Sequence, residues 1–296
     1  KIVVHGRKFL EILREMDNGE ITLEIEENIL TIKQKHTEIV LSLQDPEEFP
    51  EVKQITGTEE ISIDGATLLE MIDKVSFAVS LDETRYVLTG MHIQGREGSM
   101  VVVGTDGFRM ALYERPVEGM KSFKGITIPK RSLSEIERVI DEGDKVTLTI
   151  DEKHIQISTE NIVVVSRVIE GNFPDYENVI PRTGENMTKL NKEAFLRGLK
   201  KVSSIIGRSE PIKMTLSEGK LEIEAESEIG RAKEVMEIEY TGENIMMNFN
   251  VRFILDVVSH IQGNTVVMSA PPSYGAVLFQ EEGDDQYKNI VMPIRV

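Results

Sequence analysis

The sequence feature that most constrains the fold is one segment that occurs nearly three times. Residues 126–174 start with the strand-like run Ile-Thr-Ile-Pro, continue into a helical segment that Gly143 ends, and then alternate apolar and polar residues as strands do. Residues 2–50 repeat this order, with Gly19 aligned to Gly143, and a weaker third copy starts at Met247. A period this long predicts repeated domains instead of the short stacked units of a solenoid.

A second kind of module fills the gaps between these copies. Residues 61–104 and 189–226 each begin with a short strand-like run that leads into a helix. The two kinds alternate along the chain, and the alternation predicts a further module before Lys1. Because the sequence also starts inside a strand-like run without an initiator Met, we expect a truncated protein. Linkers that contain proline and glycine predict domains at residues 1–56, 57–183 and 184–296.

The charge of the chain is distributed unevenly. The net charge is −17, yet the five expected helices are together close to neutral, so the acidic excess lies in the strands and loops. A large negative charge by itself argues against nucleic acid as a partner. If the helices share one face, that face is neutral to basic and the opposite face is acidic. The simpler explanation, which charge alone favours, is that helices attract Lys and Arg.

Composition excludes several classes of function. Without cysteine the chain has no disulfide and no thiolate metal site, which is typical of the reducing cytoplasm. No apolar run approaches the roughly 20 residues of a membrane-spanning helix, and no signal-peptide pattern is present. Sparse aromatic residues and the absence of Trp argue against a stacking platform for single-stranded bases. We therefore expect a cytoplasmic protein.

No segment carries a pattern of catalytic or metal-binding chemistry. The five histidines are scattered, with none at metal-ligand spacing to another. Residues 104–107 lack the later Gly, Lys and Ser of a phosphate loop, and residues 281–285 lack the alternating oxygen ligands of a calcium loop. No paired nucleophile and histidine stand out. The sequence thus predicts no catalytic residue, no metal and no cofactor.

Two apolar stretches allow two interpretations each. Residues 290–296 stay apolar almost to the end of the sequence, although a free terminus of this kind normally frays. They either form an edge strand packed on the core or line a groove. Phe108 and Met110 alternate with Gly107 and Arg109 after a turn, and they fit a core strand or a pocket wall equally well.

With the triplicated pattern, four motifs make the whole chain resemble the β sliding clamp of bacterial DNA polymerase III. They are Thr-Asp-Gly-Phe-Arg-Met-Ala at 105–111, Val-Met-Pro-Ile-Arg at 291–295, Phe-Pro-Asp-Tyr at 173–176 and Asp-Glu-Thr-Arg at 82–85. The resemblance implies an α+β DNA-clamp fold of pseudo-repeated domains, with helices on the inner face and antiparallel sheets on the outer face. Residues 1–56 then correspond to the second half of clamp domain 1, whose first half is absent, 57–183 to domain 2 and 184–296 to domain 3.

The family's function implies a non-enzymatic processivity factor for DNA replication. Such a clamp is a head-to-tail homodimeric ring that encircles double-stranded DNA without sequence preference and slides. It tethers the replicative polymerase, the clamp loader and repair proteins through short linear peptides, without a membrane partner. The helix faces imply DNA-facing cations at Arg14, Lys74, Arg138, Arg197, Lys200, Lys201 and Arg252, and the loop 82–85 adds Arg85.

The family's second site is a hydrophobic cleft between the middle and last domains that receives the partner peptides. Matching positions in the middle domain and the linker are Leu88, Thr105, Gly107, Phe108, Arg109, Met110, Pro174 and Val179. Those in the last domain are Asn250, Phe253, Ile290, Met292, Pro293, Ile294, Arg295 and Val296. Phe108 replaces the His usual in the family motif, and Asn178 stands where an Arg often occurs, so the polar rim departs from the family pattern.

Dimer contacts in the family join the first domain to the last. Here the resemblance places Ile39 and Leu41 on one side, with Ile205 and Ile206 opposite. Without its first module the chain is expected to be monomeric or weakly associated. Two competing classes remain: a β-rich protein-interaction or ligand-binding protein that reuses the fold without DNA, and an esterase- or nuclease-like enzyme, which lacks a convergent polar site.

Overall fold

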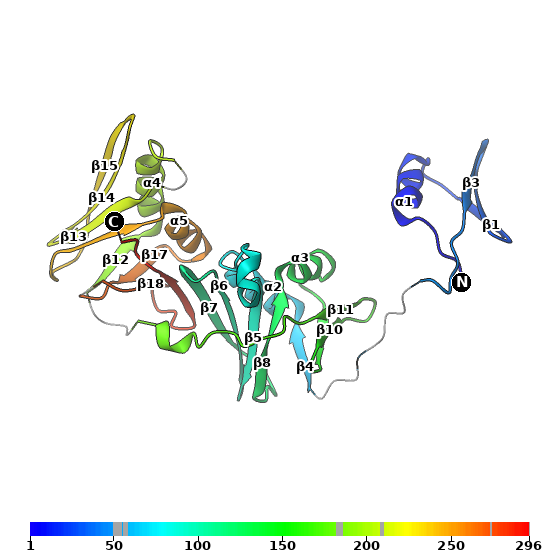
Figure 1. The fold of residues 1–296 in the computed structure, drawn as a ribbon, viewed down its shortest axis with the longest axis horizontal. Helices are drawn as coiled ribbons and strands as arrows, with labels where there is room; N and C mark the ends of the chain where they lie inside the picture. Colours follow the sequence, from blue (N-terminus) through cyan, green and yellow to red (C-terminus); the bar gives the residue numbers. More distant parts are fainter. Residues whose placement is uncertain (50–54, 56–58, 182–185, 208–209, 273, 296) are drawn as a thin grey trace. The chain divides into compact units, whose positions relative to one another are not determined.

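The computed structural model describes residues 1–49, 55, 59–181, 186–207, 210–272 and 274–295 (Figure 1). They form two compact units, which divide the chain into residues 1–53 and 54–296. The order of strand, helix and three strands that the sequence predicts recurs in the larger unit, whereas the N-terminal unit shows the helix and three strands. No helix of the described part is long and apolar enough to cross a membrane.

The N-terminal unit is one helix packed on a three-stranded antiparallel sheet. Phe9 and Ile12 on the apolar stripe of the helix pack against Leu30 and Ile32 of the central strand. The Gln34 side chain donates to the Asp17 carbonyl and accepts from its amide, each at 2.9 Å, which fixes the turn between helix and sheet. The elements are α1 (Gly6–Glu15), β1 (Thr22–Glu26), β2 (Ile29–Gln34) and β3 (Thr37–Ser42), with sheet order β1-β2-β3.

The larger unit contains four α-helices, two 3-10 helices and sixteen strands within its described residues. Its first half comprises β4 (Glu59–Asp64), α2 (Gly65–Ser76), the 3-10 helix η1 (Glu83–Leu88), β5 (Gly90–Arg96), β6 (Ser99–Thr105), β7 (Arg109–Pro116), β8 (Phe123–Pro129), α3 (Lys130–Val139), β9 (Lys145–Ile150), β10 (His154–Ser158), β11 (Val163–Arg167) and η2 (Glu177–Val179). Its second half comprises β12 (Met187–Asn191), α4 (Lys192–Ser203), β13 (Ile212–Ser217), β14 (Lys220–Ser227), β15 (Gly230–Glu237), β16 (Ile245–Phe249), α5 (Val251–His260), β17 (Thr265–Ser269), β18 (Val277–Glu281) and β19 (Tyr287–Val291).

Modules of the larger unit are interlocked by exchange of their first strands. β4 precedes α2 but pairs with β9 of the next module, while β8 precedes α3 but pairs with β5 of the previous one. β12 and β16 repeat this exchange by pairing with β17 and β13. Each pair of modules in this unit therefore shares one core and forms one domain.

An eight-stranded antiparallel sheet joins the two domains of this unit. Its order is β12-β17-β18-β19-β7-β6-β5-β8, and the junction is the pairing of β19 with β7, where Val291 lies opposite Arg109 and Tyr287 opposite Tyr113. The four helices contribute to one large core on one face of this sheet, and α4 also packs on β14 and β15 of the separate four-stranded sheet β15-β14-β13-β16. Figure 1 shows α2 beside α3 and α4 beside α5. The opposite face carries a smaller apolar cluster that includes Met110 and Ile290.

Local signals set most helix ends. Asn191 and Asn250 each accept a hydrogen bond from a backbone amide of the first helical turn, at 3.0 and 3.1 Å, and so begin α4 and α5. The helical segment that the sequence predicts up to Gly143 ends earlier, at Val139, because Ile140 turns to an extended conformation and its side chain enters the core. Both predicted domain boundaries fall on residues outside the described ones.

Candidate functional site

At the junction between β7 and β19 an apolar cluster lies on the face of the sheet opposite to the helices, where the floor of the predicted cleft is expected. Met110 and Ile290 lie directly opposite each other in the register and are buried. Phe173 and Tyr176 from the segment that leads to the last domain pack over the same cluster. The Tyr176 hydroxyl donates to Gln94 Oε1 at 2.8 Å, so this segment is anchored to the sheet. The floor thus combines strands of two domains.

The C-terminal segment, predicted as one wall of the cleft, continues from β19 beside this cluster. Beyond β19 the Met292 amide donates to the Phe108 carbonyl at 2.8 Å, and the Ile294 amide donates to the Asn248 carbonyl at 2.7 Å. Met292 and Ile294 remain 37% exposed, whereas Pro293 is buried and its carbonyl accepts from the Tyr274 hydroxyl. The stretch is therefore core strand up to Val291, and its exposed residues after that strand keep the groove interpretation as a prediction. Val296 lies outside the described residues.

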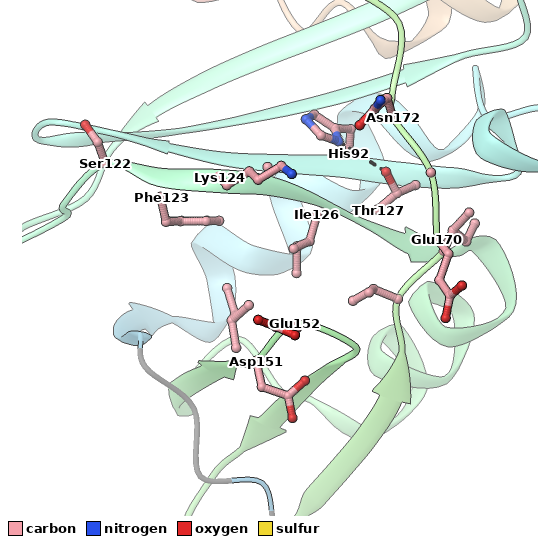
Figure 2. Close-up of a pocket in the computed structure, with 15 residues that line it drawn as sticks. His92, Ser122, Phe123, Lys124, Ile126, Thr127, Asp151, Glu152, Glu170 and Asn172 are labelled. Carbon is pink, nitrogen blue, oxygen red and sulfur yellow. Dashed lines mark hydrogen bonds between the residues drawn. The ribbon is translucent and has the colours of Figure 1, made fainter.

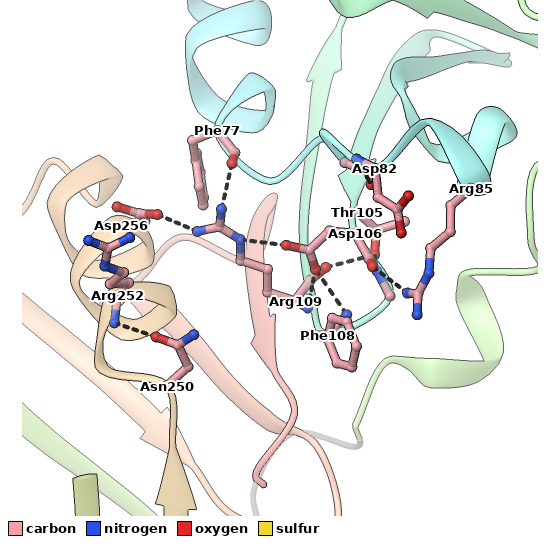
Figure 3. A network of polar contacts seen from close by, with 12 residues as sticks. Phe77, Asp82, Arg85, Thr105, Asp106, Phe108, Arg109, Asn250, Arg252 and Asp256 are labelled. Carbon is pink, nitrogen blue, oxygen red and sulfur yellow. Dashed lines mark hydrogen bonds and ion pairs between the residues drawn. The ribbon is translucent and has the colours of Figure 1, made fainter. Parts of the chain in front are cut away.

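The turn between β6 and β7 carries Phe108, a residue of the predicted rim. The Asp106 carboxylate accepts from the amides of Phe108 and Arg109 at 2.9 and 3.0 Å, which leaves the Phe108 ring 52% exposed. Arg85 covers this ring at 4.9 Å and donates to the Asp106 carbonyl at 2.7 Å (Figure 3). Gly107 has φ +85°, and a Cβ there would lie 2.5 Å from the Arg85 guanidinium, so the turn requires glycine.

The remaining cleft residues differ in their accessibility. Pro174 and Val179 are exposed on the connecting segment, and Arg295 is exposed with its guanidinium 4.7 Å from the Tyr274 ring. Leu88 is buried at the end of η1. The Thr105 hydroxyl donates to the Arg109 carbonyl at 2.6 Å and therefore supports the turn. The sequence did not single out Tyr274, since nothing local links it to the terminal segment.

Arg109 lies on the other face of the sheet from the floor. It immediately precedes Met110, and successive side chains of a strand point to opposite faces. Its guanidinium donates to the carboxylates of Asp106, at 3.1 Å, and Asp256, and to the Phe77 carbonyl at 2.9 Å (Figure 3). Phe253 of α5 also lies 4.7 Å from it, and Asn250 caps the same helix.

Lys74 was wrongly predicted to face DNA. The side chain is buried, with the residue 3% exposed, and its ammonium donates to the His260 carbonyl at 2.8 Å and lies 4.5 Å from the centre of the Tyr287 ring. Burial lowers the pKa of Lys74 below its usual value. The prediction failed because α5 and β19, which cover this position, are far away in the sequence.

The other predicted DNA-facing cations are exposed, and several are ion-paired. Arg138 pairs with Glu135 and Arg197 with Glu193, both at 3.1 Å, and Lys201 pairs with Glu234 at 2.9 Å. Arg14, Lys200 and Arg252 are exposed on their helices, and Arg85 is exposed at the rim. Exposed ion pairs of this kind are weak, so the carboxylates restrain these cationic side chains only slightly.

The predicted dimer residues are half-buried inside the chain. Ile39 and Leu41 on β3 pack against the core of the N-terminal unit, so the outward-facing apolar residue of that strand is Val40. Ile205 and Ile206, after α4, pack at the margin of the large core. The part of these four side chains available to a second copy is therefore small.

A polar hollow beside β8 shows no arrangement for catalysis (Figure 2). Burial lowers the pKa of His92 to about 4, so its imidazole is neutral. It stacks on Phe173 at 4.5 Å and its Nδ1 lies 3.1 Å from the Thr127 hydroxyl. The Asp151 carboxylate accepts from the amides of Lys153 and His154, which depresses its pKa. No three His, Cys, Asp or Glu side chains of the described residues converge as metal ligands.

Paired modules with helices on one face, joined sheets on the other and an apolar site at the junction define a clamp-type architecture. Family models of the N-terminal, central and C-terminal domains of the DNA polymerase III beta subunit match residues 1–53, 62–175 and 177–295. The beta sliding clamp of Pseudomonas aeruginosa is 29% identical over 301 residues, and that of Caulobacter vibrioides is 29% identical over 307. Each alignment covers 100% of this chain and 82% of the relative.

Solved structures agree with these relatives. The DNA polymerase III subunit beta of P. aeruginosa superposes with a TM-score of 0.95 at 28% identity, over 100% of this chain and 83% of that one. A P. aeruginosa clamp bound to griselimycin gives 0.94 at 28% identity, over 100% of this chain and 81% of that one. The Bacillus subtilis clamp superposes with a TM-score of 0.94 at 25% identity, over 100% of this chain and 80% of that one.

The chain belongs to the β sliding clamps, the beta subunits of DNA polymerase III. Members of this family are non-enzymatic processivity factors in DNA replication, and the predicted α+β clamp fold is confirmed.

Proposed function

We propose that this clamp holds its partner proteins through linear peptides bound in the cleft at the β7–β19 junction. The observation that carries the proposal is an apolar floor of buried Met110 and Ile290, bordered by the exposed side chains of Phe108 and Met292. Apolar walls with a few polar groups at the rim suit a peptide anchored by Leu or Phe side chains. The replicative polymerase, the clamp loader and repair proteins are the proposed sources of such peptides.

The test is a fluorescence titration with a labelled peptide that carries a Leu-Phe anchor. Met292→Ala removes apolar wall area without touching a buried core residue, so we expect at least about fivefold weaker binding. Met187→Ala is the matched control, because Met187 is an exposed methionine on β12, at the far edge of the same sheet. Equal affinities of the Met292→Ala and wild-type proteins would remove the cleft assignment.

The second part of the proposal is that the clamp encircles duplex DNA with its helices toward the duplex. Support comes from the four helices that share one face of the eight-stranded sheet and expose Arg138, Arg197, Lys200 and Lys201. A topological link requires no strong grip on phosphate, and cations already shared with carboxylates release few counterions. A protein that reused the fold only for protein interactions would not be retained by DNA topology.

Circular DNA separates these two possibilities. The protein is loaded on a closed circle with its clamp loader and passed through a gel-filtration column before and after the circle is cut. A clamp stays with the circle and is lost from the linear molecule, at constant salt. Retention that is equal on both forms would indicate ordinary phosphate binding and contradict the proposal.

The third part of the proposal is a head-to-tail dimer, which the internal symmetry supports. At the junction, β7 is the last strand of one kind of module and β19 is the last strand of the other. β15 is the last strand of a module of the same kind as that of β7, and β3 is the last strand of a module of the same kind as that of β19. Each has one edge without a partner strand in the described part of the chain. Pairing of β3 in one copy with β15 in another would repeat the junction between molecules.

Analytical ultracentrifugation tests the dimer. We expect weak, concentration-dependent dimers of this chain, because the β3–β15 pairing is available between copies. A chain that sediments as a monomer at every concentration would contradict the proposed pairing. The cytoplasmic location also remains a prediction, and a cell fractionation would check it.

A further inference from the structure

Arg109 joins the middle and last domains by contacts that leave little of it free. Its side chain is 11% exposed, and three of its nitrogen atoms donate to Asp106, Asp256 and the Phe77 carbonyl. Asp106 and Phe77 belong to the middle domain, whereas Asp256 belongs to α5 of the last domain. The guanidinium also lies near two rings, 5.5 Å from Phe77 and 4.7 Å from Phe253.

A second contact crosses the same junction in the same way. The Lys74 ammonium, at the end of α2, donates to the His260 carbonyl at the end of α5, and the Tyr287 hydroxyl of β19 donates back to the Lys74 carbonyl at 2.8 Å. The rings of Phe77 and His260 stack at 4.1 Å between these contacts. The C-terminal ends of α2 and α5 are thus capped by cations, where the helix dipole favours positive charge.

These contacts lie directly beneath the cleft. Arg109 and Val291 form the last pair of the β7–β19 register, and the next pair along, Met110 and Ile290, forms the floor on the opposite face. Phe108 before β7 and Met292 after β19 continue directly from this last pair, so the spacing of their exposed side chains depends on the junction. The Arg109 guanidinium itself points to the helix side, away from the floor (Figure 3).

We propose that Arg109 and Asp256 form an interdomain latch that presets the cleft for its peptide. Arg109 is then a positioning residue and does not contact the peptide, although a resemblance-based assignment places it in the site. The inference rests on the proposed cleft. When the latch is absent, only a fraction of molecules has the junction closed, and the apparent affinity falls by that fraction.

A double-mutant cycle distinguishes a latch from a peptide contact. Asp256→Asn keeps the shape of the side chain and removes its charge, and Arg109→Gln removes the guanidinium. For a latch we expect each change to weaken peptide binding about fivefold, mainly through slower association, and the double variant to bind no more weakly than Arg109→Gln alone. Backbone amides of Ala111 and Asn289 should also exchange hydrogen faster in Asp256→Asn than in the wild type.

The opposite result is equally clear. If Arg109 contacts the peptide, Asp256→Asn leaves the affinity unchanged and Arg109→Gln weakens it by the same factor with Asp or Asn at position 256, which overturns the latch. The control pair is Arg138→Gln with Glu135→Gln, an exposed ion pair on α3 that should change neither affinity nor exchange. Met292→Ala in the same series tests the cleft separately, so failure of the latch and failure of the cleft give different patterns.

Discussion

At the scale of single residues, burial across the domain junction decides which polar groups are used. Asn289 on β19 is fully buried, and among the described residues neither atom of its side-chain amide has a hydrogen-bond partner. Its neighbour Tyr287 is buried as well, but its hydroxyl reaches the Lys74 carbonyl. A buried amide without a partner destabilises the folded state, because water would have satisfied it in the unfolded chain.

We therefore expect Asn289→Leu, which has nearly the same shape, to raise the free energy of unfolding by about 1–2 kcal/mol. Chemical denaturation with urea provides the measurement. Asn161→Leu is the control, since Asn161 is exposed and its side chain should contribute little. A lower free energy of unfolding for Asn289→Leu would show that the amide has a partner in solution.

His92 predicts a pH dependence with a definite sign. Its pKa in the folded protein, about 4, lies below its ordinary value of 6.5, so the unfolded chain binds the proton more readily between these values. Stability should fall as the pH drops from about 6.5 to about 4, by at most about 3 kcal/mol from this residue. In His92→Gln this part of the slope should be missing in denaturation curves measured across the window. His154→Gln is the control, because His154 is less buried. An identical slope in the wild type and His92→Gln would contradict the assignment of this pH dependence to His92.

At the scale of elements, close approach of helix and sheet sets the tolerance for side chains. A Cβ on Gly104 of β6 would lie 2.3 Å from the Val75 carbonyl of α2, so helix and strand are in direct backbone contact there. Gly143, which follows α3, has nothing within 4 Å of the same position. These two glycines look alike in the sequence, but only one is required by packing.

We expect Gly104→Ala to lower the free energy of unfolding by about 1–3 kcal/mol, because α2 must move away from the sheet. Gly143→Ala should change stability by no more than about 0.5 kcal/mol. Thermal or urea unfolding of both variants makes the comparison. Equal stability of the two would mean that α2 shifts without loss of packing.

At the scale of the whole molecule, every described residue of the proposed cleft and latch belongs to the larger unit. The N-terminal unit has its own small core around Leu30 and Ile32. We therefore expect the fragment 54–296 to bind a cleft peptide with the affinity of the whole chain, as measured by the same titration. Met292→Ala in the fragment should weaken binding as it does in the chain. A large loss of affinity on removal of residues 1–53 would show that the N-terminal unit contributes to the site.

The elements were largely predictable because their signals are local. Amphipathic periodicity located the helices around Phe9, Leu133 and Phe195 to within a few residues, and alternation located most strands. The apolar floor residues of the cleft followed from the family motif. Lys74, in contrast, lay outside the apolar stripe of α2 and is nevertheless buried. This error arose because distant elements of the chain cover its side chain.

By itself the sequence determined the repeat, the order of strand and helix in each module, the acidic character of the chain and its family. These properties depend on spacing within segments of a few tens of residues, where the backbone geometry dictates which side chains share a face. Only the tertiary structure decided that first strands are exchanged, that β7 pairs with β19, and that Arg109 and Lys74 bind the last domain. Such contacts join residues far apart along the chain, and their partners are chosen by packing of whole surfaces, which no local pattern records.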